Sequence, residues 1–148
     1  MSAPGREAPV RDVVVVGAGV AGLALARELR ARGREVLLLE RAAGVGGRCA
    51  TRRVEGQPVD HGVAFLHGRD AAFLAELDAL AAAGPLPGWP RVTAGEGVPC
   101  QPAAFGPGER RVALAGGVSA FAKRLADGLD VRLGANVAAL RLGGGAGR

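Results

Sequence analysis

The sequence has no tyrosine, and aromatic residues make up only 3% of the chain. Proteins that bind single-stranded nucleic acids stack bases on aromatic side chains, so this scarcity argues against that class. The net charge of +5 comes from scattered arginines, without a run of five or more like charges. Such scattered charges are typical of a solvated surface. We therefore expect no nucleic-acid partner.

Cysteines and long apolar runs are also scarce. Cys49 and Cys100 lie far apart and belong to no C-x-x-C pair, which argues against a disulfide framework and a zinc site, so we expect no metal. The longest apolar stretch, 13–26, contains three glycines and is too short to span a bilayer. Residues 1–10 lack the apolar core of a signal peptide. These features predict a cytoplasmic protein without a membrane partner.

Glycine and apolar residues are abundant, with 25 glycines and 49% hydrophobic residues among 148. This apolar content suits one folded core, and the glycines predict tight turns and close backbone approaches. We expect a flexible tail over 1–10, a folded domain over 11–142 and a disordered tail over 143–148. Residues 85–110 hold most of the prolines and predict an inserted loop region.

A strand, a helix and a second strand are predicted at the start of the domain. Val13–Val16 is a β-branched run that ends at a glycine, which predicts a parallel strand buried on both faces. Apolar spacing over 20–32 predicts a helix that stops at Gly33, and 35–40 predicts a second buried strand. This order indicates an α/β fold with a Rossmann-like βαβ crossover.

Shorter elements are expected in the next part of the chain. Residues 51–54 and 63–65 predict minor strands around a turn at 55–58. Residues 70–83 predict a helix, for which Asp70 is the expected N-cap.

The end of the domain predicts one more helix and a strand pair. The helix is expected over 117–127. Residues 129–133 and 136–142 predict two short strands that meet at a turn over 134–135.

A G-x-G-x-x-G motif lies between the first predicted strand and helix. It comprises Gly17, Ala18, Gly19, Val20, Ala21 and Gly22. In this position it predicts a dinucleotide site: Gly17 permits the turn, Gly19 lets a pyrophosphate approach the backbone, and Gly22 lets the helix pack closely. The N–H groups at the helix N-terminus would bind the phosphates.

Glu40 ends the second predicted strand, 18 positions after Gly22. A carboxylate at this point accepts hydrogen bonds from ribose hydroxyls and repels a 2′-phosphate. The sequence therefore predicts FAD or NAD rather than NADP. The neighbouring Arg41 weakens this exclusion slightly.

A second glycine motif, Gly44-Val45-Gly46-Gly47-Arg48, favours FAD. Paired glycines let main chain approach a flat ring, and Arg48 supplies a charge for an anion. Glu40-Arg41 followed by this motif resembles the opening of the FAD-dependent amine oxidoreductases. The resemblance implies an FAD-binding domain of the glutathione-reductase type, in which Gly46 and Gly47 run beside the flavin and Arg48 faces the phosphate and ribityl groups.

Residues 47–53 and 59–65 are similar to the renalase-like branch, whose members oxidise dihydronicotinamides or related amines. In that comparison, Asp60 and Gly62 match a backbone segment near the flavin. Residues 66–68 resemble instead the polyamine and monoamine oxidases.

The resemblance extends to 116–120 and 129–140, where Val137 matches the residue that holds the adenine through its main chain. Members of the family are considerably longer. We therefore expect an incomplete fold, the N-terminal part of such an enzyme, with weak FAD binding unless a separate chain completes the flavin site.

No catalytic residue is identified. His61 and His67 lack a third metal ligand nearby and are interpreted as structural. Asp60 is expected to cap backbone N–H groups rather than act as a general base, and Cys49 to be a buried filler rather than a thiolate.

Three functions remain open at this point. The first is an FAD-dependent oxidoreductase that removes a hydride from a small-molecule amine or a reduced nicotinamide. The second is a non-catalytic FAD- or NAD-binding module or subunit. The third is a desaturase of the phytoene type, which shares the early glycine motifs.

Overall fold

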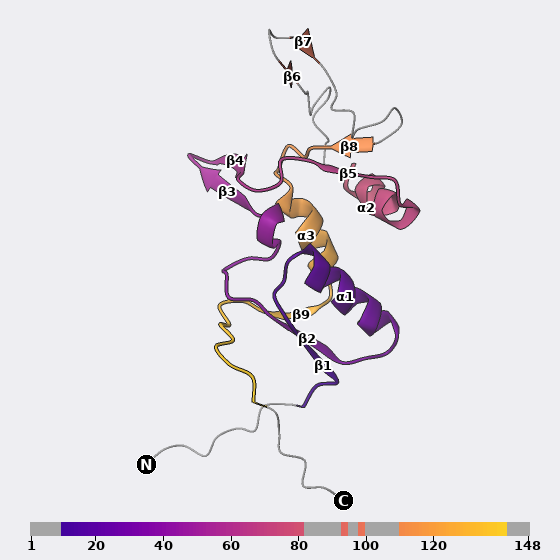
Figure 1. Cartoon of the computed structure of the whole chain (residues 1–148), viewed down its shortest axis with the longest axis vertical. Coiled ribbons are helices and arrows are strands. Elements are labelled where there is room, and N and C mark those ends of the chain that lie inside the picture. Colours follow the sequence, from indigo (N-terminus) through magenta and orange to yellow (C-terminus); the bar gives the residue numbers. More distant parts are fainter. Residues whose placement is uncertain (1–9, 82–92, 95–97, 100–109, 142–148) are drawn as a thin grey trace, which may run out of the picture.

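The computed structural model describes residues 10–81, 93–94, 98–99 and 110–141. Its base is a parallel sheet in the order β1-β2-β9, formed by Val13–Val16, Val36–Leu39 and Asp130–Arg132. Helix α1, Val20–Ala31, connects β1 to β2, so these elements form the predicted Rossmann-like βαβ unit. Figure 1 shows this sheet at one end of the molecule, beside α1.

The remaining elements are short. β3 (Thr51–Val54) and β4 (Gln57–Asp60) form an antiparallel hairpin, and β5 (Leu66–Gly68) pairs antiparallel with β8 (Arg110–Val112). The other elements are a 3-10 turn at Gly47–Cys49, helix α2 at Ala71–Ala81, the pair β6 (Thr93–Ala94) and β7 (Val98–Pro99), and helix α3 at Ser119–Ala126.

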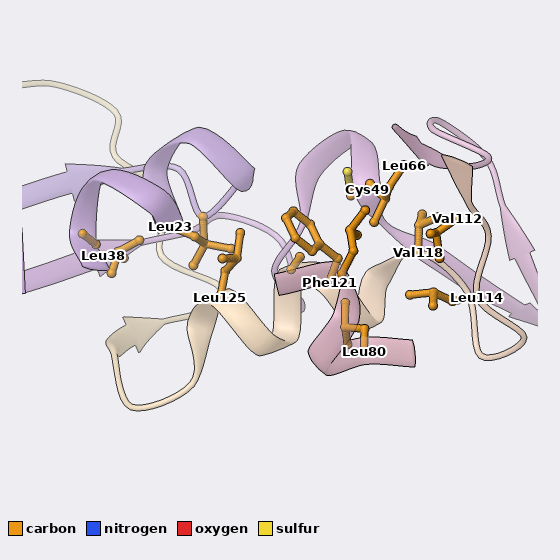
Figure 2. Packing of buried hydrophobic residues seen from close by; sticks show 14 of the residues in the cluster. Leu23, Leu38, Cys49, Leu66, Leu80, Val112, Leu114, Val118, Phe121 and Leu125 are labelled. Carbon is orange, nitrogen blue, oxygen red and sulfur yellow. The ribbon is translucent and has the colours of Figure 1, made fainter. Parts of the chain in front are cut away.

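Helix α3 joins the sheet end of the molecule to the end that holds the short strands. Its buried side chains include Phe121 and Leu125, which belong to one hydrophobic cluster with Leu23 of α1, Leu38 of β2 and Leu80 of α2 (Figure 2). Burial of such side chains is the main favourable term in folding. The core is therefore continuous from the sheet to α2.

An ion-pair network connects the three helices at their surface. The carboxylate of Glu76 on α2 lies 3.0 Å from the guanidinium of Arg27 on α1 and 2.6 Å from that of Arg124 on α3. Burial raises the pKa of Glu76, but the hydrogen bonds from the two arginines outweigh it and lower the pKa overall. The network fixes α2 against the α1–α3 pair.

Several predicted elements are confirmed. The strands at 13–16 and 51–54 have the predicted bounds, and the helix predicted over 20–32 ends before Gly33, whose φ of +77° is left-handed. The backbone N–H of Phe73 donates to Asp70 Oδ1 at 2.9 Å, so Asp70 caps α2 as expected. Helix α3 lies within the predicted range 117–127.

The prediction that β1 is buried on both faces is wrong. Val15 is 8% exposed, but Val14 and Val16 are 50% and 56% exposed. Successive side chains of a strand point to opposite faces. Val15 faces α1, whereas the face that carries Val14 and Val16 is left open by the residues that the structure describes. Four consecutive valines carry no alternation from which this could be predicted.

The predicted strand pair at 129–133 and 136–142 is also wrong. β9 pairs in parallel with β2, and no strand is present in 136–141. Beyond β9, the N–H of Ala135 donates to the Glu40 carbonyl at 2.8 Å, so the segment follows the end of β2 rather than turning back on β9.

One further predicted strand lies at a different position in the structure, and several predicted segments fall outside the described residues. The strand predicted at 63–65 is displaced by three residues, since β5 runs over Leu66–Gly68. The tails over 1–9 and 143–148 and most of the insertion over 85–110 fall outside the described residues.

Candidate functional site

The first glycine loop leaves β1 and enters α1. Gly17 has a φ of +100°, and its N–H donates to the Leu39 carbonyl at 2.8 Å, which holds the turn on β2. Gly19 is the N-cap of α1, and among the described residues no side chain caps the N-terminus of this helix. A Cβ built at Gly19 would meet no atom within 4 Å, so bare backbone faces open space in front of the helix N-terminus.

Gly22 has a different role, because it lies where α1 packs against the turn. A Cβ at this position would collide with the carbonyl oxygen of Gly17 and lie 3.3 Å from Val15 Cγ1. The predicted reason for this glycine, close packing of the helix, agrees with the geometry.

The second glycine loop lies directly against the first. The Gly46 N–H donates to the Ala18 carbonyl at 2.8 Å, and Gly46 forms an isolated parallel bridge with Gly19. Gly46 and Gly47 have φ values of +118° and +55°, and a Cβ at Gly47 would lie 3.4 Å from Gly19 Cα. The two motifs thus form one continuous backbone surface.

A cavity of about 560 Å³ opens on this joined surface. It is lined by Gly19, Val20, Ala21, Gly46, Gly47, Arg48, Cys49 and Val63. Arg48 is exposed, and Ala21 is exposed in the first turn of α1. The cavity therefore offers the N-terminus of a helix and a guanidinium group, both of which attract anions.

A second cavity, of about 300 Å³, lies beside Gly17, the first residue of the first glycine loop. It is lined by Val16, Gly17, Leu39, Glu40, Arg41, Ala135, Asn136 and Val137. Gly17 lines this cavity and Gly19 lines the larger one, so an elongated ligand could follow the loop from one to the other.

Glu40 is held in place by backbone N–H groups. Its Oε1 accepts from Ala42 at 2.8 Å and its Oε2 from Ala18 at 2.7 Å. These two hydrogen bonds lower the pKa of Glu40 below its usual value of 4.5, and the bond from Ala42 has the larger effect on the pKa. The carboxylate is therefore ionised at neutral pH and connects Ala18 of the first loop to Ala42, in the segment that leads into the second loop. Sequence reasoning did not predict this structural role.

Asp60 caps the N-terminal end of α3. Its Oδ1 accepts from the Thr51 hydroxyl at 2.6 Å and from the Val118 N–H at 3.1 Å. The Thr51 Oγ1 in turn accepts from the Ser119 N–H at 3.0 Å. The expectation that Asp60 caps backbone groups is confirmed, whereas its contact with a cofactor stays a prediction.

Gly62 lies against the second glycine loop. A Cβ there would collide with the Arg48 carbonyl, and the neighbouring Val63 N–H donates to that carbonyl at 3.0 Å. The segment that follows β4 is thereby fixed beside Arg48.

Sequence reasoning missed Thr51. The hairpin register pairs Thr51 with Asp60, so their side chains lie on the same face. This pair could have been found by placing the turn at 55–56, since Gln57 and Pro58 belong to β4 rather than to the turn.

The other candidate side chains are not gathered into a catalytic group. His61 and His67 are exposed, and the His67 ring lies 5.9 Å from that of Phe65. Cys49 is buried, and this burial raises the pKa of its thiol, so the interpretation as a buried filler is confirmed. No group of three potential metal ligands occurs in the described part of the chain.

None of the described helices is long and apolar enough to span a lipid bilayer.

The part of the chain that holds both glycine loops is similar to known proteins. Residues 15–77 match the family described as NAD(P)-binding Rossmann-like domain. A protein of Mycobacterium tuberculosis named as a flavin-containing monoamine oxidase is 56% identical over 64 residues, which cover 43% of this chain and 14% of that protein. Putrescine oxidase of Kocuria rosea is 46% identical over 70 residues, or 47% of this chain and 15% of the relative.

A third relative has a different named reaction. Hydroxyneurosporene desaturase of Rubrivivax gelatinosus is 54% identical over 50 residues, which cover 34% of this chain and 10% of the relative. The matches thus span about a seventh or less of each of these proteins, and they do not single out the renalase branch. Residues 15–77, which include the Rossmann-like unit and the joined glycine loops, thus match the NAD(P)-binding Rossmann-like domain and are similar to the N-terminal part of FAD-dependent amine oxidoreductases.

Proposed function

We propose that this chain binds FAD, with the diphosphate in front of α1. The observation that carries the proposal is the open space at Gly19, where bare backbone and an uncapped helix N-terminus meet the second glycine loop. Uncapped N–H groups and the helix dipole favour a phosphate there. Arg48, which lines the same cavity, supplies the countercharge.

The adenosine half of FAD would occupy the smaller cavity, between Glu40 and Val137. Each Glu40 oxygen accepts one backbone N–H and keeps a lone pair for a ribose hydroxyl. The ionised carboxylate disfavours a 2′-phosphate, and this supports FAD over NADP-type nucleotides. Asp60, Gly62, Gly46 and Gly47 would support the segments beside the flavin ring.

We propose that the protein is an FAD-dependent oxidoreductase acting on a small-molecule amine or a dihydronicotinamide. The flavin supplies the hydride-accepting chemistry, and the chain binds and orients it. The named functions of the monoamine and putrescine oxidase relatives support the amine class. A carotenoid-type desaturation is the alternative, supported by the desaturase relative, and a non-catalytic nucleotide-binding subunit is the third.

The extent, location and partners of the site are part of the same proposal. We assign residues 11–142 to the FAD-binding domain, with 85–110 as an insertion, and infer a cytoplasmic location. The flavin ring would be enclosed by additional residues, supplied by a separate chain or by a longer form of this one. The matched part of this chain covers only 14% of the monoamine oxidase relative and 15% of putrescine oxidase, which supports the proposal that further residues enclose the flavin.

The proposal is tested by titrating the purified chain with FAD and following flavin fluorescence and absorbance. Gly19→Ala places a methyl group where the diphosphate would lie, so we expect at least a tenfold loss of FAD affinity. The matched control is Gly44→Ala, which also meets no neighbour within 4 Å but lies outside both cavities. Equal affinities for the two variants, or no FAD binding by the unchanged chain, would contradict it.

The reaction is tested separately. FAD-loaded protein is mixed anaerobically with putrescine, a monoamine or reduced nicotinamide, and bleaching of the flavin absorbance is recorded. Bleaching by an amine supports the amine oxidase function. If none of these compounds bleaches the flavin, the proposed reaction is contradicted, whereas the proposal that the chain binds FAD still stands.

A further inference from the structure

Strand β1 has one free side. The sheet has the order β1-β2-β9, so β1 pairs with β2 on one side and with no described strand on the other (Figure 1). The N–H of Val13 donates to the Glu35 carbonyl at 3.1 Å, and that of Gly17 donates to the end of β2 at 2.8 Å. Backbone groups alternate in direction along a strand, so the N–H and C=O groups of Val14 and Val16 point to the free side.

The side chains of the same two residues add apolar surface to this edge. Val14 and Val16 are 50% and 56% exposed, on the sheet face opposite to Val15 and α1. A row of unpaired backbone groups beside exposed apolar side chains is a template for a further strand. The edge of β1 therefore offers both the hydrogen bonds and the apolar contacts of β-strand addition.

Other described strands carry features that hinder such pairing. β9, at the opposite edge of the sheet, has exposed Asp130 and Arg132, and Pro58 in β4 carries no N–H. Charged side chains and prolines are common means by which proteins prevent strand addition. The four residues of β1 are all valine, so its free edge lacks both means of protection.

We propose that a second copy of this chain pairs along this edge, with the two β1 strands antiparallel about a two-fold axis at Val15. In this register Val14 lies opposite Val16 of the second copy, and their outward-facing N–H and C=O groups meet. The two-fold axis repeats this exchange, so each of these groups gains a partner. The sheet then continues from one copy into the other, with the exposed valines of both copies on one face.

The antiparallel register also suits the charges of the chain. It places Arg11 and Asp12, which precede β1, beside the uncharged glycine loop of the second copy rather than beside each other's equivalents. By composition, the two ends of the chain are poorer partners for β1. Residues 1–9 contain two prolines and residues 143–147 contain four glycines, and both residue types are depleted in strands.

Sedimentation equilibrium of the full chain without FAD, at increasing concentrations, tests the pairing. We expect a reversible equilibrium between monomer and dimer. Val14→Lys places a charge among the exposed valines and should raise the dissociation constant of the dimer about tenfold or more. Leu25→Lys, at a position of α1 that is also 50% exposed, is the matched control and should leave the constant unchanged. A chain that stays monomeric at every concentration, or equal effects of the two substitutions, would overturn the proposal.

Amide hydrogen exchange of the unchanged chain, followed by NMR, locates the interface without any substitution. As the dimer forms, exchange of the Val14 and Val16 amides should slow more than that of Val13 and Val15, whose N–H groups point to β2. Fast exchange of Val14 and Val16 where the dimer predominates would place the contact elsewhere and overturn the proposal. The pairing requires no FAD, so a failed FAD titration would reject the proposed function alone.

Discussion

At the scale of single residues, Gly22 determines how closely α1 approaches the turn after β1. A methyl group there would collide with the Gly17 carbonyl, which is itself held by the Leu39 hydrogen bond. We therefore predict that Gly22→Ala lowers the free energy of unfolding by about 1–3 kcal/mol, the usual cost of overpacking. Urea denaturation measures this loss.

The control for this prediction is Gly44→Ala, whose Cβ has open space and whose φ is not left-handed. It should leave the unfolding midpoint unchanged or raise it slightly, because alanine restricts the unfolded chain. Equal losses for both variants would show that glycine content, and not the contact with Gly17, controls stability.

Glu40 makes the stability of the folded state depend on pH. The Ala42 and Ala18 N–H groups lower the pKa of this carboxyl below 4.5, so the folded state binds its proton less tightly than the unfolded state does. Its stabilising contribution is present above pH 4.5 and is lost as the pH falls through the lower folded-state pKa.

We predict that Glu40→Gln destabilises the chain by about 1–2 kcal/mol at pH 7, because the charge-assisted hydrogen bonds are lost. Urea midpoints of the two proteins, measured from neutral pH to well below the Glu40 pKa, should converge at the acidic end. A constant difference over that range would mean that the charge of Glu40 is not what stabilises the loop.

At the scale of elements, the Thr51 hydroxyl joins the β3–β4 hairpin to α3. It donates to Asp60 and accepts from the Ser119 N–H, and Ser119 is buried. Thr51→Val keeps the shape but leaves both partners without this hydroxyl, so we predict a loss of about 1–3 kcal/mol in the free energy of unfolding.

Thr51→Ser retains the hydroxyl and serves as the control. Thermal unfolding followed by circular dichroism should rank the proteins in the order wild type, serine variant, valine variant. A serine variant as unstable as the valine variant would assign the effect to the lost methyl group instead.

The elements that local sequence signals specify were predictable. The valine run, the glycine stop at Gly33 and the Asp70 cap each act within a few residues, and the structure has β1, α1 and α2 where these signals place them. The G-x-G-x-x-G motif is likewise local, since its glycines respond to the turn and to the helix that directly follows.

Features that depend on contacts between residues far apart in the sequence could not be predicted from local sequence signals. The path of 133–141 depends on backbone donors of Gly134 and Ala135 that reach the end of β2. The capping of α3 by Asp60 joins residues 58 positions apart, and nothing near Asp60 in the sequence identifies Val118 as its partner. The open face of β1 depends on what covers the sheet, which a uniform valine run does not encode.

At the scale of the whole molecule, the proposed FAD site lies where distant segments meet. The first loop connects β1 to α1, the second follows β2, and residues 135–137 come after β9. The Gly46 N–H bond to the Ala18 carbonyl and the bridge between Gly19 and Gly46 join the two loops into one structural unit. Ordering one loop should therefore order the other.

We predict that FAD slows backbone hydrogen exchange in 17–22 and 44–48 together, and leaves the exchange of α2 unchanged except through global stability. A ligand that binds only the folded state at 100 times its Kd adds about 2.7 kcal/mol to the free energy of unfolding. Hydrogen exchange with mass spectrometry, compared with and without FAD, measures the local effect. Gly44→Ala should retain the joint protection and Gly19→Ala should lose it, whereas protection confined to one loop would contradict the coupling between them.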